Sequence, residues 1–357
     1  MYGDNQFKWE MGVSAMFLNF GSMLLLHSWS LFRYADQGTL IINSSDLNNF
    51  YKNITANGQG NMNVDSLTDS NGMIFTGKNV SAAINNLNNG VGKIVVSATL
   101  CLTADDLKNI YTVIEQSQSD VNNYPGKITA GDRLILRAHL LNNAQDTISE
   151  VSSVKLFLKT ITANGSINLE DLSLTIQSDF TNEIGNSWKA NRDFSLTTTE
   201  SIRNSGNVEA GRNVSLTASS ITNESTGVIS ANETLKLNAK ANLINTGSAI
   251  GNDITANANN ISNINETAVI AATNSVNLFA AVSVENKDEA AIYSLGDINI
   301  AGGAAQDNNG RYIVSTGYLL NQSATIEAQR GIQISAVSLI KRGRLSTCRR
   351  KSELRVI

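Results

Sequence analysis

The stretch VEAGRNVSLTASSITNESTGVISA, residues 208–231, contains the pattern that decides the fold. It begins with Val208-Glu-Ala210, continues with Val214-Ser-Leu216, and repeats its opening as Ile229-Ser-Ala231, 21 residues later. Each pair places two apolar residues on either side of a polar one, and this alternation is typical of a strand with one buried face. The stretch therefore predicts short β-strands that recur once in every unit of about 20 residues.

The apolar pair that begins at Val214 recurs along most of the chain. Its first residue, the anchor, falls at Val80, Leu100, Leu134, Val154, Leu172, Phe194, Val214, Leu235, Ile254, Val276, Ile298 and Ile332. Nine of the eleven intervals lie near 20 residues, and the other two are both 34. Six residues before the anchor, nine of twelve positions are Ile or Val, which supports the same repeat independently. Weaker copies at Leu40 and Gly60 extend the array to about residue 38.

A unit of about 20 residues is too short for a repeat that contains helices, and it suits one coil of about three short strands. Stacked coils place each strand beside its copy in the next coil, in parallel and about 4.8 Å away. The inward Ile, Leu and Ala columns then fill a continuous core. We expect an all-β fold, a right-handed parallel β-helix (solenoid), over residues 38–336.

A second column follows the anchor by about nine or ten residues and reads apolar–any–Asn. Its asparagines are Asn89, Asn109, Asn142, Asn182, Asn204, Asn223, Asn245, Asn263 and Asn286. Asparagine tolerates left-handed backbone geometry and hydrogen bonds to nearby backbone in turns. Stacked turns therefore predict a ladder of side-chain amides, each bonded to the next. A ridge that contacts glycans is the alternative interpretation of this column.

The composition fits an ordered, strand-rich chain. Charged residues make up 16% and hydrophobic residues 41%, and there is one proline, whereas disorder usually needs high charge and low hydrophobicity. Lysine and arginine number 27 against 31 acidic residues, so the net charge of −4 gives no argument for nucleic-acid binding. Cys101 and Cys348 are too few for a disulfide framework or a cysteine-based zinc site.

The stretches GKITAGDRLIL (126–136), 208–231 and SATIEAQRGIQISA (323–336) resemble the repeats of filamentous haemagglutinins. The same repeats form the stalks of contact-dependent growth-inhibition exoproteins, and the resemblance covers about residues 70–336. It implies a large protein of the two-partner secretion type, threaded through an outer-membrane transporter and displayed as a fibre at the bacterial surface. The implied partners are that transporter and a receptor or glycan on a host or neighbouring cell.

This sequence departs from the family pattern in two respects. The secretion motif Asn-Pro-Asn-Leu is not found, since Pro125 is the single proline, and no toxin module follows the repeats. These departures bring into question the secretion of this chain by itself and any toxic activity.

The two ends differ from the repeats. Residues 1–37 contain an uncharged apolar run, Met11–Phe32, diluted by polar residues. It is interpreted as a signal or anchor, as an apolar cap of the β-helix, or as an incorrectly chosen start, and we expect no stable membrane span. Residues 337–357 are basic; they form either a tail that binds anionic surfaces or, as we prefer, a segment outside the fold.

The two 34-residue intervals each add about fourteen residues to one coil, near 110–123 and 303–317. Insertions in solenoids form loops or hairpins on one face, often where partners bind. A neutral insertion is the alternative.

The sequence offers no catalytic, cofactor-binding or metal-binding residues. His27 and His139, the only histidines, lie in separate segments and do not predict a metal site or a triad. Three acidic pairs occupy different coil positions in distant coils, so they do not predict the two converging carboxylates of a glycosidase. These pairs are Asp105-Asp106, Glu170-Asp171 and Asp288-Glu289. We therefore expect neither enzyme activity nor a cofactor.

The expected function is that of a structural and adhesive stalk fragment of a secreted surface fibre, which mediates attachment by reach and by many weak contacts. One alternative is the stalk of a growth-inhibition protein that delivers a toxin, without its toxin module. A second alternative is a carbohydrate-active β-helix enzyme.

Overall fold

The computed structural model describes the backbone of residues 15–20, 24–25, 39–49, 53–69, 72–89, 93–97, 99–108, 127–130, 133–142, 147–149, 154–162, 167–347 and 355–356. Side chains are described for most of 39–104 and for 170–340. Within these residues every regular element is a β-strand. No helix of the described chain is long and apolar enough to cross a membrane. The chain forms two compact units, Met1–Arg137 and Ala138–Ile357.

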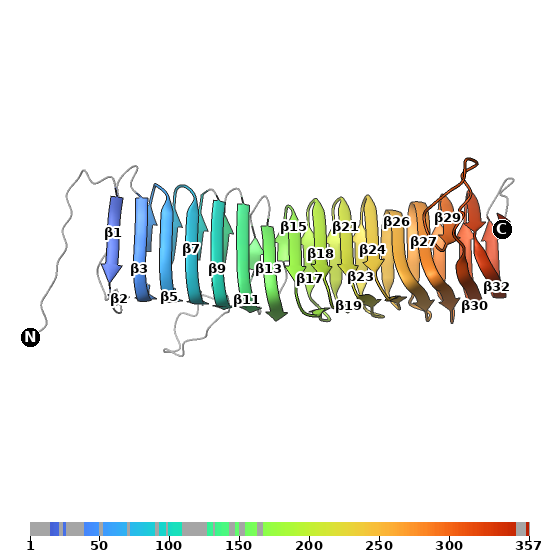
Figure 1. Ribbon diagram of the computed structural model, residues 1–357, viewed down its shortest axis with the longest axis horizontal. Helices are drawn as coiled ribbons and strands as arrows, with labels where there is room; N and C mark the ends of the chain where they lie inside the picture. Colours follow the sequence, from blue (N-terminus) through green and yellow to red (C-terminus); the bar gives the residue numbers. More distant parts are fainter. Residues whose placement is uncertain are drawn as a thin grey trace, which may run out of the picture. The chain divides into compact units, whose positions relative to one another are not determined.

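The first unit alternates long and short strands, and each pairs in parallel with its copy in the next coil (Figure 1). Leu40, Gly60, Val80 and Leu100 stand in one register column, as the spacing predicts. The strands are β1 (Ala15–Phe20), β2 (Leu24–Leu25), β3 (Thr39–Asn48), β4 (Asn53–Ala56), β5 (Gly60–Thr68), β6 (Met73–Thr76), β7 (Val80–Asn88), β8 (Lys93–Val96), β9 (Thr99–Lys108), β10 (Lys127–Ala130) and β11 (Arg133–Asn142), which runs into the second unit.

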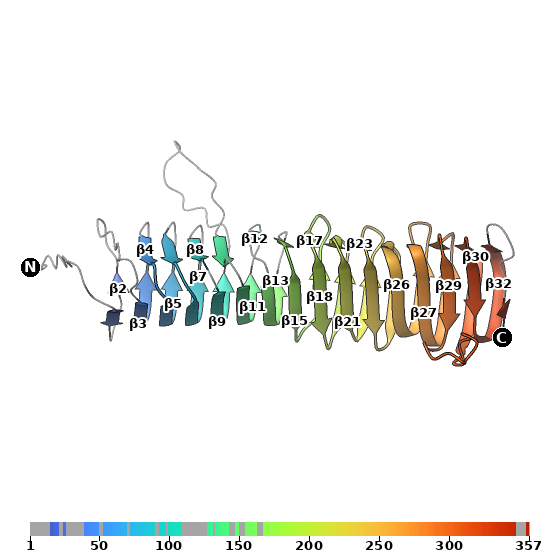
Figure 2. The same cartoon turned by 90° about the horizontal axis from the view of Figure 1, so that it is seen from above.

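In the second unit most coils consist of three strands (Figure 2). The first strand of a coil carries the anchor, as Asp193–Thr198 does, and the second and third follow it, as Ser201–Asn204 and Asn207–Ala210 do. In β26, β27 and β30, strands of one coil run together. The strands are β12 (Thr147–Ser149), β13 (Val154–Thr162), β14 (Ile167–Leu169), β15 (Leu172–Ile176), β16 (Phe180–Asn182), β17 (Ser187–Ala190), β18 (Asp193–Thr198), β19 (Ser201–Asn204), β20 (Asn207–Ala210), β21 (Asn213–Ala218), β22 (Ser220–Asn223), β23 (Val228–Ala231), β24 (Thr234–Ala239), β25 (Asn242–Asn245), β26 (Ser248–Ile264), β27 (Val269–Lys287), β28 (Ala291–Ser294), β29 (Asp297–Ala301), β30 (Thr316–Ala328), β31 (Gly331–Ile334), β32 (Ala336–Thr347) and β33 (Arg355–Val356).

The predicted anchors form one continuous column in this unit. Phe194 pairs with Val214, and Val214 pairs with Leu235, so the spacing of the sequence repeat is the length of the coil. The column contains Val154, Leu172, Phe194, Val214, Leu235, Ile254, Val276, Ile298 and Ile332. The predicted parallel β-helix with coils of about 20 residues is confirmed, at roughly 21 residues per turn.

The interior is filled by alternate residues of every strand. Leu196, Leu216 and Leu237 stack on one another and are at most 3% exposed. Phe180 and Trp188 meet edge to face, with ring centroids 5.0 Å apart, where one coil carries two large aromatic side chains. Full burial of such a side chain stabilises the fold by about 1.5–3 kcal/mol relative to leaving it in water.

Several boundaries predicted from the sequence fall on residues that the structure does not describe. The insertion near 110–123 lies outside the described residues, whereas the insertion near 303–317 is described and forms a hairpin between β29 and β30. β32 crosses residue 337, the predicted start of the basic tail, and pairs with β30. In the N-terminal segment, β1 pairs in parallel with β3.

Candidate interaction surfaces

The asparagine column forms the predicted ladder, and it lies inside the solenoid. The side-chain Nδ2 of Asn204 donates to Oδ1 of Asn223 at 2.8 Å, and Asn223 donates in the same way to Asn245. The continuous series is Asn182, Asn204, Asn223, Asn245, Asn263, Asn286 and Asn321, with donor–acceptor distances of 2.7–2.9 Å. All seven side chains are at most 2% exposed. Because the ladder is buried, a glycan cannot reach these amides, and their role is to join one coil to the next.

The first unit begins a similar ladder with a carboxylate in it. Nδ2 of Asn49 donates to Oδ1 of Asp69 at 2.7 Å, and both residues are fully buried. Asn89 occupies the same position in the following coil and is also fully buried. The side chains of Asn109 and Asn142, predicted members of the column, lie outside the described residues.

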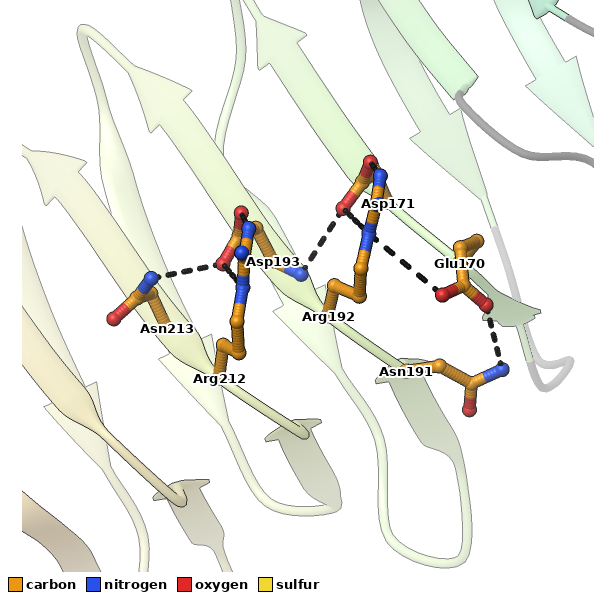
Figure 3. Close-up of polar contacts among 7 residues, drawn as sticks. All are labelled: Glu170, Asp171, Asn191, Arg192, Asp193, Arg212 and Asn213. Atoms are coloured by element: carbon orange, nitrogen blue, oxygen red, sulfur yellow. Dashed lines mark hydrogen bonds and ion pairs between the residues drawn. The ribbon is translucent and has the colours of Figure 1, made fainter.

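A second polar ladder runs on the outside, at the corner that precedes the first strand of each coil (Figure 3). Arg192 bonds to both carboxylate oxygens of Asp171 in the preceding coil and lies 3.7 Å from Glu170. Asn191 donates to the same Glu170. The predicted acidic pair Glu170-Asp171 therefore faces a guanidinium rather than a second pair of carboxylates.

The next coil repeats this contact. Arg212 bonds to both oxygens of Asp193, and Asn213 donates to Asp193 Oδ1 at 2.9 Å. These hydrogen bonds lower the pKa of Asp193 below its ordinary value, and the bond from Arg212 has the largest effect. The same contact raises the pKa of Arg212, so both partners stay charged at neutral pH.

Towards the C-terminal end the corner becomes an amide–carboxylate network. Asp253 Oδ1 accepts from Asn274 at 2.8 Å and from Ser275 at 2.6 Å. Arg330 donates to Asn274 Oδ1 at 2.9 Å and lies 3.2 Å from Asp297. Here, too, the polar groups are used in contacts between coils.

The hairpin inserted after β29 is the longest insertion within the described residues of the second unit, and both views show it projecting beside β29 (Figures 1 and 2). Asp307 closes its turn by accepting the backbone N–H groups of Asn309 and Arg311, each at 2.8 Å. Tyr312 folds back onto Phe279, with ring centroids 5.4 Å apart. The next two residues, Ile313 and Val314, are 62% and 44% exposed.

Beside the hairpin, Tyr318, Glu285 and Lys287 form a small polar cluster. Tyr318 donates its hydroxyl to Glu285 Oε1 at 2.5 Å, and Lys287 Nζ lies 2.6 Å from Oε2. The hydrogen bond from Lys287, and next in size the one from Tyr318, lower the pKa of Glu285. The hydrogen bond to Glu285 raises the pKa of Tyr318. A general acid or base works best with a pKa near the operating pH, and these shifts run the other way.

The remaining candidate groups do not converge. Asp288 and Glu289 lie in a left-handed turn with φ of 57° and 68°, distant in sequence and coil position from Glu170. The side chains of Asp105, Asp106, His27 and His139 lie outside the described residues. Among the described residues, no three His, Cys, Asp or Glu side chains are grouped so that they could hold a metal ion.

The fold and these surfaces define a parallel β-solenoid whose polar groups are mostly engaged between coils. Comparison of the chain with protein-family models, with curated proteins and with solved structures finds no match.

Proposed function

We propose that this chain is a structural and adhesive stalk segment of a haemagglutinin-like fibre on the bacterial surface. The observation that carries the proposal is the unbroken ladder from Asn182 to Asn321, which joins seven successive coils through their buried amides. A solenoid of this kind gains length by adding coils, and each added coil presents a further copy of the surface. The resemblance of the repeats to filamentous haemagglutinins supports the same proposal.

Two further observations favour a scaffold over an enzyme. Each charged group at the outer corner whose pKa is shifted keeps its charge at neutral pH, as Asp193 and Arg212 do. The exposed apolar side chains Ile313 and Val314 are on the inserted hairpin, which is the position expected for a contact loop. The proposed partners are an outer-membrane secretion transporter and a receptor or glycan on another cell.

The test is an adhesion assay with beads that carry the purified full chain. We expect such beads to bind cultured epithelial cells and an excess of soluble chain to compete. A chain with Leu216→Asp serves as the unfolded control, because it buries a charge in the core. Binding no greater than that of beads with an inert protein of similar charge would refute the adhesive part of the proposal.

A further inference from the structure

One outer face of the second unit differs from the others in its chemistry. The short-strand face is formed by the outward side chains of β17, β20, β23, Ser248–Ile250 of β26, Val269–Ala271 of β27, β28 and Thr325–Glu327 of β30. β17 and β23 are labelled in Figures 1 and 2. The hairpin does not cover this face, because it leaves between the first and second strands and packs on Phe279 of the first.

Among the residues whose side chains the structure describes, two columns of seven run along this face. One column is Lys189, Glu209, Ser230, Ile250, Ala271, Tyr293 and Glu327. The other is Ser187, Asn207, Val228, Ser248, Val269, Ala291 and Thr325. All fourteen side chains are partly or fully exposed, and Ile250 is 44% exposed. The three central coils are uncharged and carry Val228, Ile250, Val269 and Ala271 beside Ser230 and Ser248, and the charges are towards the two ends.

The order of residues in these columns is self-complementary. Ile250 is the fourth of seven coils, so Lys189 and Glu327 each stand three coils away from it, about 14 Å on opposite sides. Consider a two-fold axis that lies between two copies and runs parallel to the strand Ser248–Ile250. It places the short-strand faces of the two copies against each other, with the two solenoids antiparallel. Lys189 of each copy then lies opposite Glu327 of the other, and Ile250 lies opposite Ile250.

The intermediate positions also match. The same axis brings Val228 opposite Val269, and it brings Glu209 opposite Tyr293. The Tyr293 hydroxyl oxygen accepts from Gln329 at 3.2 Å, which leaves its own hydrogen for a carboxylate. Lys189, Glu209 and Glu327, the charged residues among these fourteen, thus each gain a hydrogen-bonding or ionic partner.

Within the part of the chain that the structure describes, Lys189, Glu209 and Glu327 have no ionic partners. Lys189 lies beside Glu209 in register, yet neither they nor Glu327 form an ion pair in the described part of the protein. A parallel arrangement, with the axis along the solenoid, would leave Lys189 opposite Ser187 and Glu327 opposite Thr325. Charge complementarity therefore selects the antiparallel arrangement.

From these observations we infer that the short-strand face is an antiparallel docking surface for a second copy of this chain, centred on Ile250. Seven strands of four residues cover about 350–400 Å² per copy, well below the roughly 800 Å² per partner of stable complexes. Association of free chains is consequently weak and depends on concentration. Fibres held side by side at a cell surface would gain from many such contacts.

The first experiment is sedimentation equilibrium of the full chain and its variants over a concentration series. The unmodified chain is expected to form dimers at high concentration, and Ile250→Glu, which sets two carboxylates on the axis, to stay monomeric. Lys189→Glu or Glu327→Lys alone should weaken the dimer on the order of tenfold, because two ion pairs become repulsive. The double variant should associate as the unmodified chain does. Equal association of the unmodified chain and Ile250→Glu, or no recovery in the double variant, would overturn the inference.

The second experiment locates the axis by crosslinking. Ser248 faces its own copy, so Ser248→Cys is expected to be joined by a short bismaleimide in a background with Cys101→Ser and Cys348→Ser. Ser215→Cys is the matched control, since Ser215 is a partly exposed outward residue of the first strand. Crosslinking of both variants to the same extent, or of the control alone, would contradict the proposed surface. Circular dichroism melting curves establish that each variant is folded.

Discussion

Asn204 donates a hydrogen bond from its side-chain amide to the side-chain oxygen of Asn223, 2.8 Å away in the next coil. Asn223 in turn donates to Asn245 and to the backbone oxygens of Gly227 and Ser248. Each amide from Asn204 to Asn321 is both donor and acceptor, so the removal of one of them affects the coils on both sides.

We expect Asn223→Ala to lower the free energy of unfolding by about 1–3 kcal/mol, because it leaves the buried amide of Asn204 without its side-chain acceptor. Asn238→Ala is the control. Asn238 accepts from Asn257 at 2.8 Å on the outer surface, where water replaces the lost partner. Urea unfolding of both variants measures the difference, and an equal loss would refute a special role for the buried ladder.

Leu216→Asp is expected to unfold the coils around β21, because it places a charge where the native side chain is fully buried. Thr217→Asp, one residue away and facing outward, should change stability by less than about 0.5 kcal/mol. Hydrogen exchange of the amides in β18, β21 and β24 shows the effect coil by coil. Protection that survives in the Leu216 variant would mean that the core assignment is wrong.

Gly211 permits a close approach between coils. A Cβ at this position would lie 1.9 Å from the backbone oxygen of Asn191. Gly211→Ala should therefore force two coils apart and cost about 1–3 kcal/mol. In contrast, Gly303→Ala meets only the side chain of Val314 at 3.5 Å and should be nearly neutral. The midpoints of urea unfolding distinguish the two variants, and equal midpoints would contradict this explanation.

Glu285 is expected to contribute to the acid sensitivity of the fold. Lys287 and Tyr318 hold its pKa below the ordinary value of 4.5. A carboxyl with a lowered folded pKa stabilises the protein above its ordinary pKa, and this contribution is lost as the pH falls through the lowered value. Lys287→Met should raise the pKa of Glu285 and reduce the loss of stability in acid by on the order of 1 kcal/mol.

Titration of the Glu285 carboxyl by NMR in both proteins measures this shift, and thermal melts across acid pH measure its effect on stability. Lys236→Met is the control, because Lys236 is an exposed residue of β24 without an ion pair in the described structure. An unchanged Glu285 pKa in the Lys287 variant would show that the ion pair is not formed in solution.

The hairpin should be separable from the solenoid. Gly302 N donates to Val314 O at 2.7 Å, so the two ends of the insertion are adjacent and residues 303–314 can be removed. The deletion would expose the ring of Phe279, so the variant also carries Phe279→Asn. We expect this variant to show little change in melting temperature and a loss of bead adhesion. Undiminished adhesion in a folded deletion variant would place the contact surface elsewhere on the chain.

Most of the core could be predicted from the sequence, because alternate burial makes every strand repeat its apolar pattern at the coil length. Phe194, Val214 and Leu235 stand in the column that their spacing indicates. The predicted column does not include Asn321, because the hairpin places it 35 residues after Asn286. Its signal is present, since Leu319-x-Asn321 has the same apolar–any–Asn pattern as the other members.

The surface was harder to predict. Arg192 and Asp171 are 21 residues apart, one coil length, and they become neighbours once the coils are aligned. The contact of Tyr312 with Phe279 leaves no periodic signal, because it depends on the direction in which the hairpin folds back. The complementarity of Lys189 and Glu327 depends on the register of the seven strands that form the short-strand face.

The amide ladder also has a polarity, since every Nδ2 points to the coil that follows in the chain. A break between two coils would leave a free donor on one broken end and a free acceptor on the other. When two such ends stack head to tail, the free donor of one pairs with the free acceptor of the other, whereas head-to-head stacking brings two like groups together. The buried ladder thus has a direction from the amino to the carboxyl end. A coil stacked on this solenoid must run in the same direction to form a hydrogen bond with the exposed amide.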